Sequence, residues 1–376
     1  VEQSAPGLYT ANLGNIENGE EVTVELRYAQ LLPFERDQLR LSIPCAVAAR
    51  YGDQHRNGGL APQENCAADI AAEYPLTIRI ALLGETAKAA ISCPSHAFSV
   101  MPAEDGLAVL VNSGALLDRD FVLVLNGLVE RSFAMLAPDD GGHMMLAAFR
   151  PDIPLSNEPL RMKILVDCSG SMAGDSIKQT KQALGLLLKA LQSEDQVSFS
   201  RFGGSVRHES DRVLACSPDT LIRLADAISA VQADMGGTEM ERALLSTFND
   251  IAIPEESAHP ACVLLITDGA VWDVEKIVRA SQASGQRVFA IGVGSAPAES
   301  LLRELAWQTG GMCKLVTPNE SIVTAVWHML DKMRGAGTEA LRVDWGAKPV
   351  WQSALPLRLY DGETAHVFAS FANKPE

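Results

Sequence analysis

The chain has 376 residues, of which 47% are hydrophobic and 21% charged, and at about 150 residues per domain this length predicts two to three domains. Such a chain can bury sizeable cores, which excludes intrinsic disorder, collagen and disulfide-stapled miniproteins. The 47 acidic and 31 basic residues give a formal net charge of −16. That charge repels phosphate backbones and anionic lipids, so it disfavours binding to nucleic acid or to a membrane surface.

The sequence contains no run of about 18 apolar residues without charge, so it predicts no membrane-spanning segment. Its seven cysteines are scattered and form no Cys-x-x-Cys pair, which argues against a zinc ribbon or a thioredoxin-type motif. Unpaired cysteines favour the cytoplasm, and the cell surface or secretion is the alternative. The oligomeric state cannot be predicted.

The first 160 residues are dominated by strand patterns. Alternating or β-branched apolar segments, separated by Gly, Pro, Asn and Asp, occur at residues 20–32, 38–44, 75–82, 107–112 and 120–126. They predict an antiparallel, mostly β region. Residues 50–68 read as a long loop.

The pattern changes near Met162. Short, nearly continuous apolar runs predict strands buried on both faces at residues 162–167, 196–202, 262–268 and 287–294. Amphipathic patterns predict helices at residues 174–192, 218–232, 239–251, 272–284, 298–309 and 319–334. Strands alternating with helices indicate a doubly wound, Rossmann-like α/β domain with a parallel sheet.

Strand patterns return after Arg334, at residues 340–345, 355–360 and 365–371. We therefore expect a multi-domain chain in which an α/β domain at residues 161–334 is inserted between β regions. In this interpretation, residues 335–376 complete the β domain of residues 36–160.

The first buried strand ends in Asp167-Cys168-Ser169-Gly170-Ser171. Asp167, Ser169 and Ser171 alternate along the chain, so in an extended loop their side chains face the same side. Ligands of open parallel sheets bind outside the carboxyl ends of the strands. One carboxylate and two hydroxyls at that edge predict a site for Mg²⁺ or Ca²⁺ rather than zinc.

Two further segments can reach this edge. Thr238 follows a Gly-Gly turn just before a predicted helix, and Asp268 follows another buried strand in "LLITDG". Three separate elements thus deliver the oxygens of Asp167, Ser169, Ser171, Thr238 and Asp268 to one face.

These motifs, D-x-S-x-S at 167–171, "GGT" ending at Thr238 and "TDG" at 267–269, resemble the metal-ion-dependent adhesion site of von Willebrand factor type A domains. The resemblance covers residues 162 to about 334. It implies that Ser169, Ser171 and Thr238 bind the ion directly, while Asp167 and Asp268 act largely through bound water. The implied ion is Mg²⁺, or Ca²⁺ or Mn²⁺, and a protein partner would supply an Asp or Glu side chain to it.

Residues 5–34 resemble the closing part of a vault/inter-alpha-trypsin domain, and residues 43–53 and 93–100 resemble segments of bacterial proteins that pair this domain with a type A domain. Inter-alpha-trypsin inhibitor heavy chains share this pairing. The resemblance implies that residues 1–35 are the C-terminal remnant of such a domain and that residues 36–160 form a β-rich region. We therefore expect the chain to begin inside a domain.

Enzymatic readings of the same residues are weaker. Cys168 has no His nearby in sequence, which a reactive thiol would need, and Ser171 lies outside the Gly-x-Ser-x-Gly pattern. Glu239 and Asp175 are first-turn helix acids in the simplest interpretation, with metal binding by Glu239 as the alternative. Trp272 follows Asp268 closely and could lie at the metal edge, although packing is its default role.

The sequence therefore predicts a non-enzymatic, metal-dependent protein-interaction or adhesion module. One alternative is an intracellular regulatory scaffold or co-chaperone that works with an ATPase machine. The ATPase would be a separate protein, because the chain itself contains no Walker motif. A metal-assisted hydrolase is the third possibility, and it lacks a general base.

Overall fold

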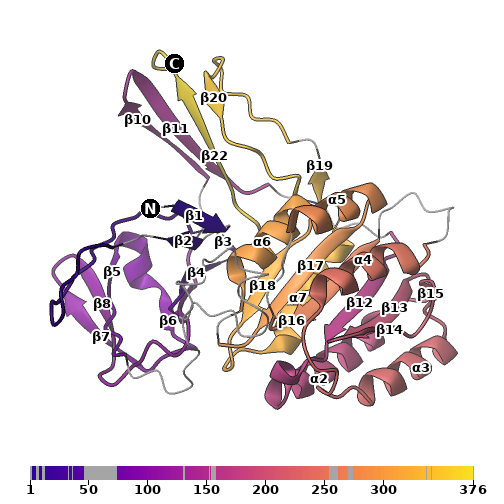
Figure 1. Ribbon diagram of the computed structural model, residues 1–376. Helices are drawn as coiled ribbons and strands as arrows, with labels where there is room; N and C mark the ends of the chain where they lie inside the picture. The colour runs from indigo at the N-terminus through magenta and orange to yellow at the C-terminus, as the bar shows by residue number, and fades with distance from the viewer. Residues whose placement is uncertain are drawn as a thin grey trace.

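Figure 1 shows the computed structural model of the protein. The structure describes residues 2–5, 8–10, 13–32, 34–35, 37–45, 74–129, 132–151, 153, 158–253, 261–269, 274–295, 297–335, 337–339 and 341–375. The expected loop at 50–68 and Trp272 lie outside these residues.

The α/β domain is built on a seven-stranded sheet with the order β14-β13-β12-β16-β17-β18, in which β15 also pairs with β13. The parallel strands are β12 (Arg161–Asp167), β13 (Gln196–Phe202), β16 (Cys262–Thr267), β17 (Arg287–Val293) and β18 (Cys313–Val316). The short strands β14 (Val206–His208) and β15 (Leu214–Ala215) pair antiparallel with β13. Every residue of β16 is buried, as its continuous apolar run predicts.

Helices cover both faces of this sheet. They are α2 (Asp175–Ala190), α3 (Pro218–Ser229), α4 (Met240–Asp250), α5 (Val274–Ser284), α6 (Glu299–Gln308) and α7 (Ile322–Arg334). One core joins α2, α3 and α7 to one side of β12 through Ile164 and Val166, and a second joins α4, α5 and α6 to its other side through Leu165. Alternate residues of β12 thus face different cores, which confirms the predicted doubly wound fold.

Local sequence explains where several helices begin. Pro218 occupies the first turn of α3, and the side chain of Ser217 accepts a hydrogen bond from the Thr220 N–H. Ser321 caps α7 in the same way through the Thr324 N–H. The six predicted helices agree with the observed ones to within a few residues.

Two antiparallel sheets precede the α/β domain (Figure 1). One contains β3 (Phe34–Glu35), β4 (Gln38–Ile43), β9 (Phe121–Asn126) and β6 (Ala90–Ser92), and the other contains β5 (Arg79–Leu83), β8 (Gly106–Val111) and β7 (Phe98–Ala103). A core that includes Leu39, Leu82, Val109, Phe121 and Leu123 fills the space between them. A hairpin of β1 (Glu2–Ala5) and β2 (Leu8–Thr10) lies at the start of the chain.

A further four-stranded sheet has the order β10-β11-β22-β20 and stands above the rest of the molecule in Figure 1. It combines β10 (Phe133–Asp139) and β11 (Gly142–Phe149) with β20 (Trp351–Gln352) and β22 (Ala365–Phe371). β22 pairs antiparallel with β11, with Phe368 opposite Leu146. Chain segments on either side of the α/β domain therefore share one sheet. A short pair, β19 (Thr338–Glu339) and β21 (Arg358–Leu359), lies between the α/β domain and this sheet.

Two strand predictions were wrong. Residues 20–32 form no strand, and their apolar side chains are exposed, with Leu26 76% and Tyr28 75% accessible. Residues 341–345 also lack strand structure. Alternation indicates that a segment can pair, but a strand forms only where a neighbour supplies hydrogen bonds, and the described residues supply none here. The β10–β11 hairpin, by contrast, was not predicted.

Polar contacts join the first β region to the α/β domain. The Glu35 carboxylate lies 2.6 Å from Lys314 Nζ on β18 and 2.8 Å from His328 Nε2 on α7. Arg40 donates two hydrogen bonds to Glu320, at 2.5 and 3.0 Å. In the described part of the chain, no helix combines the length and the apolar character needed to cross a bilayer.

Candidate metal site

The loop after β12 is held in place by backbone hydrogen bonds to two neighbouring segments. The Cys168 N–H donates to Phe202 O at 2.7 Å, and Cys168 O accepts from the Met235 N–H at 2.9 Å. The Gly170 N–H then donates to Gly236 O at 3.1 Å. These bonds place the loop of residues 168–172 beside the Gly-Gly turn that precedes Thr238.

Asp167 lies at the end of β12 with none of its surface exposed. Its Oδ1 accepts from the Ser169 N–H at 2.9 Å, and its Oδ2 accepts from Thr267 Oγ1 at 2.7 Å. Burial raises the pKa of Asp167 to about 6, and the nearby Asp268 carboxylate adds to that rise, while the hydrogen bonds oppose it. A cation beside Asp167 would offset both unfavourable effects.

Ser169, Ser171 and Asp268 form a chain of hydrogen bonds across two strand ends. Ser169 Oγ lies 3.0 Å from Ser171 Oγ, which donates to Asp268 Oδ1 at 2.8 Å. The structure therefore brings together side chains that lie 97 residues apart in sequence.

Thr238 lies on the segment before α4 and packs beside the residue that follows Asp268. A Cβ added at Gly269 would lie 2.8 Å from Thr238 Cγ2, so the threonine packs directly against the loop that carries Asp268. Only glycine fits this close approach. Thr238 Oγ1 is buried and has no hydrogen-bond partner among the described residues.

The oxygen donors of these residues fit a hard divalent cation. A buried hydroxyl without a partner is costly, and a metal ion beside it would supply the missing interaction. Nowhere in the residues that the structure describes do three or more His, Cys, Asp or Glu side chains gather as they would around zinc. The hydroxyls supply most of the donors here, as suits Mg²⁺, Mn²⁺ or Ca²⁺.

The enzymatic interpretations find no support in this geometry. Cys168 is fully buried, and burial raises the pKa of its thiol to about 12, so the nucleophilic thiolate is suppressed. Ser171 donates its proton to a carboxylate rather than to a histidine. The exposed Glu239 precedes the first residue of α4, and its N–H donates to Gly203 O at 2.9 Å.

Thr267 was not predicted as a site residue, although it lies in the "TDG" motif. This fully buried residue links the two strands of the site, because its Oγ1 donates to Asp167 and accepts from the Gly269 N–H at 3.0 Å. A polar residue that ends an otherwise apolar buried strand is the signal that could have identified it.

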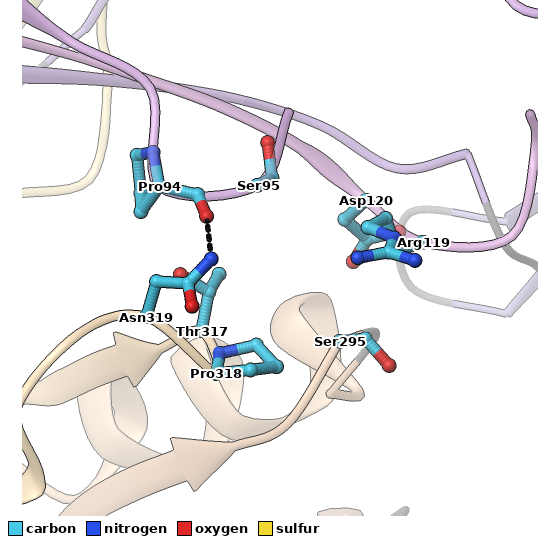
Figure 2. Close-up of a pocket in the computed structure, with 8 residues that line it drawn as sticks. All are labelled: Pro94, Ser95, Arg119, Asp120, Ser295, Thr317, Pro318 and Asn319. Carbon is cyan, nitrogen blue, oxygen red and sulfur yellow. Dashed lines mark hydrogen bonds between the residues drawn. The ribbon is translucent and has the colours of Figure 1, made fainter. Parts of the chain in front are cut away.

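A small crevice lies at the same end of the sheet, between the α/β domain and the first β region (Figure 2). Ser295 and Thr317, which follow β17 and β18, line it from the α/β domain, and Ser95 and Asp120 line it from the first β region. Figure 2 shows the Asn319 side chain directed at the Pro94 carbonyl, to which it donates at 2.6 Å. The space in it suffices for about one water molecule.

Residues 162–324 match the family model of the von Willebrand factor type A domain. Together with the doubly wound sheet, this match identifies the α/β part of the chain as a type A domain flanked by antiparallel β regions. Domains of this type generally mediate interactions between proteins without catalysing a reaction, often through a bound metal ion.

Several curated proteins are similar over most of this chain. Von Willebrand factor A domain-containing protein 5A of Mus musculus is 26% identical over 372 residues, which cover 91% of this chain and 46% of the mouse protein. The Homo sapiens protein of that name is 24% identical over 382 residues, covering 93% and 48%. A von Willebrand factor A domain-containing protein of Dictyostelium discoideum is 27% identical over 220 residues, covering 57% and 26%. The chain spans about half the length of the protein 5A relatives.

Similar solved structures include a von Willebrand factor type A protein from Catenulispora acidiphila, with a TM-score of 0.46 and 15% identity over 83% of this chain and 68% of that one. Proximal thread matrix protein 1 from the mussel byssus, solved with zinc in its MIDAS motif, has a TM-score of 0.41 and 13% identity over 50% and 48%.

Proposed function

We propose that the type A domain binds a divalent cation through Asp167, Ser169, Ser171, Thr238 and Asp268, and that the bound ion recognises an acidic side chain of a protein partner. The function is binding rather than catalysis.

One observation carries this proposal. Among the described residues, Thr238 Oγ1 is buried without a hydrogen-bond partner, and the Thr238 side chain packs against Gly269, next to the Asp268 that accepts from Ser171. Domain packing alone would leave this position to an apolar residue, because an unsatisfied buried hydroxyl costs about 1–3 kcal/mol. A cation coordinated by the Thr238 and serine oxygens removes this cost.

The donor set also explains why the ion would recognise a carboxylate. Ser169, Ser171 and Thr238 contribute neutral oxygens, and the two aspartates are the only charged members of the proposed set. An ion held mostly by neutral oxygens keeps much of its positive charge, and Mg²⁺ retains exchangeable waters in such sites. A carboxylate from the partner can replace one of these waters and complete the octahedron.

The test is isothermal titration of Mg²⁺ into the full chain, followed by partner capture from native lysate with and without EDTA. The Asp167→Ala/Ser169→Ala variant should lose both Mg²⁺ binding and capture, and Mg²⁺ added after EDTA should restore capture by the unsubstituted chain. Asp175→Asn is the matched control, because Asp175 is 87% exposed at the start of α2, near the site. Mg²⁺ binding that survives in the double variant would contradict the proposal.

A further inference from the structure

Lys163 lies in the middle of β12, and none of its surface is exposed. Its ammonium group donates hydrogen bonds to Thr247 O at 2.9 Å and to Ile251 O at 2.7 Å. Among the described residues, no carboxylate forms an ion pair with it. The partners of this buried cation are backbone carbonyls at the C-terminal end of α4.

A second buried side chain serves the same helix end. Gln286, which precedes β17 and is 3% exposed, donates through Nε2 to Phe248 O at 3.1 Å. The last carbonyls of a helix have no partner within the helix, and its negative dipole end favours a cation. Lys163 and Gln286 therefore anchor the C-terminal end of α4 to the sheet.

The other end of α4 lies at the metal site. The helix begins at Met240, two residues after Thr238. Its 11 residues form a rigid rod about 16 Å long, so the position of one end determines the position of the other.

Strand β12 carries one residue near each end of α4. Lys163 and Asp167 are four residues apart on β12, and alternate residues of a strand face the same side. β12 thus presents Asp167 to the metal site and Lys163 to the far end of the helix that follows Thr238.

We propose that Lys163, assisted by Gln286, is a positioning residue for the metal site, because it fixes α4 along β12 and so holds Thr238 Oγ1 at the proper distance from Ser171 and Asp268. This inference rests on the proposed metal binding. Packing alone does not call for an ammonium group at this position, since an apolar residue would fill it without the cost of burying a charge.

The experiment is a Mn²⁺ titration of the full chain, with free Mn²⁺ measured by its electron paramagnetic resonance signal. Lys163→Met keeps a similar volume but removes all three hydrogen bonds of the ammonium group, to Thr247 O, Phe248 O and Ile251 O. It should weaken Mn²⁺ binding about tenfold, as loss of a residue that orients a ligand does. Gln286→Met removes one hydrogen bond and should weaken Mn²⁺ binding about threefold. If Lys163→Met does not fold, the Gln286→Met variant alone tests the inference. Tyr360→Phe is the matched control, because it removes two buried hydrogen bonds, to Arg287 and Gly310, on elements other than α4.

A double-mutant cycle with Thr238→Ala distinguishes positioning from general destabilisation. If Lys163 acts through Thr238, Lys163→Met should add less than about twofold in the Thr238→Ala background. Three outcomes overturn the inference: Mn²⁺ affinity equal to that of the unsubstituted chain in both single variants, an equal loss in Tyr360→Phe, or an undiminished effect in the Thr238→Ala background. If the unsubstituted chain binds no Mn²⁺, the proposed function itself is wrong.

Discussion

Two threonines at the candidate metal site have opposite hydrogen-bonding states. Thr267 Oγ1 donates to Asp167 and accepts from the Gly269 N–H, whereas Thr238 Oγ1 has no partner among the described residues. A hydroxyl that is satisfied within the protein serves the fold, and one that is not is available to a ligand. The two residues can therefore be separated by substitution.

Thr238→Val should leave the free energy of unfolding without metal unchanged or slightly higher, since the lost hydroxyl has no protein partner, and should weaken Mg²⁺ binding at least about tenfold. Thr267→Val should instead cost about 1–3 kcal/mol of stability, because it leaves a buried carboxylate oxygen and an N–H without partners. Urea denaturation and Mg²⁺ titration of both variants check this contrast. A large loss of metal-free stability in Thr238→Val would show that its hydroxyl has a structural role.

Glu363 is a residue whose pKa is set by its buried environment. Its Oε2 accepts from the Tyr360 N–H at 2.9 Å, and burial raises its pKa from 4.5 to about 7. Between these two values the folded state holds a proton that the unfolded state has released. The stability contributed by this proton is fully present below pH 4.5 and is lost as the pH rises through 7.

Glu363→Gln should therefore be more stable than the unsubstituted chain at pH 8 and nearly equal to it at pH 4.5. The difference should approach about 3 kcal/mol at most, reduced by the partial exposure of the side chain. Urea denaturation of both proteins across this pH range measures it. A difference that does not change with pH would exclude Glu363 as the titrating group.

Among the elements, α7 is fixed to the sheet at its C-terminal end. Arg334 lies 2.5 Å from Asp195, whose side chain is fully buried and also accepts from the Leu160 and Gln192 N–H groups. The carboxylate thus holds the start of β12, the turn before β13 and the end of α7 together.

Removing the guanidinium would leave the buried Asp195 carboxylate without a compensating charge. Arg334→Met should cost about 3 kcal/mol of stability. Lys178→Met should cost less than about 0.5 kcal/mol, because its contact with Asp175 is largely exposed, with 76% of the lysine side chain accessible. Thermal denaturation followed by circular dichroism compares the two, and equal losses would contradict the assigned role of the Arg334–Asp195 pair.

At the scale of the whole molecule, ion pairs and hydrogen bonds join the first β region to the type A domain. Glu35 contacts Lys314 and His328, and these neighbours hold its pKa well below the ordinary range despite burial. Arg40 and Glu320 form a bidentate pair in which 13% and 25% of the side chains are accessible. Contacts of this kind couple two domains electrostatically rather than through a shared apolar core.

We expect Arg40→Gln/Glu35→Gln to separate the unfolding of the two regions into distinct calorimetric transitions, with the type A domain still folded when the first β region melts. About 1 M NaCl should produce a smaller shift in the same direction, because the pairs are partly screened. Lys88→Gln, which removes an exposed pair with Glu85, is the control. Identical thermograms for the double variant and the control would show that other contacts couple the regions.

The α/β domain and the residues of its candidate site could be predicted from the sequence alone. Buried parallel strands such as β16 are continuous apolar runs, and helices such as α3 carry local caps. Asp167 ends one strand and Asp268 follows another, and a parallel sheet must bring these strand ends to one edge. These signals are local, so they can be read from the sequence without knowledge of the fold.

Features that depend on partners distant in sequence could not be predicted and became visible in the folded chain. The alternating residues 20–32 find no strand to pair with, whereas β22 pairs with β11 across the whole type A domain. The same holds for single groups: Lys163 donates to carbonyls at the end of α4, and Thr238 Oγ1, beside Gly269, finds no partner in the described part of the chain. Pairing and burial are properties of two segments at once, and a pattern within one segment cannot specify the other.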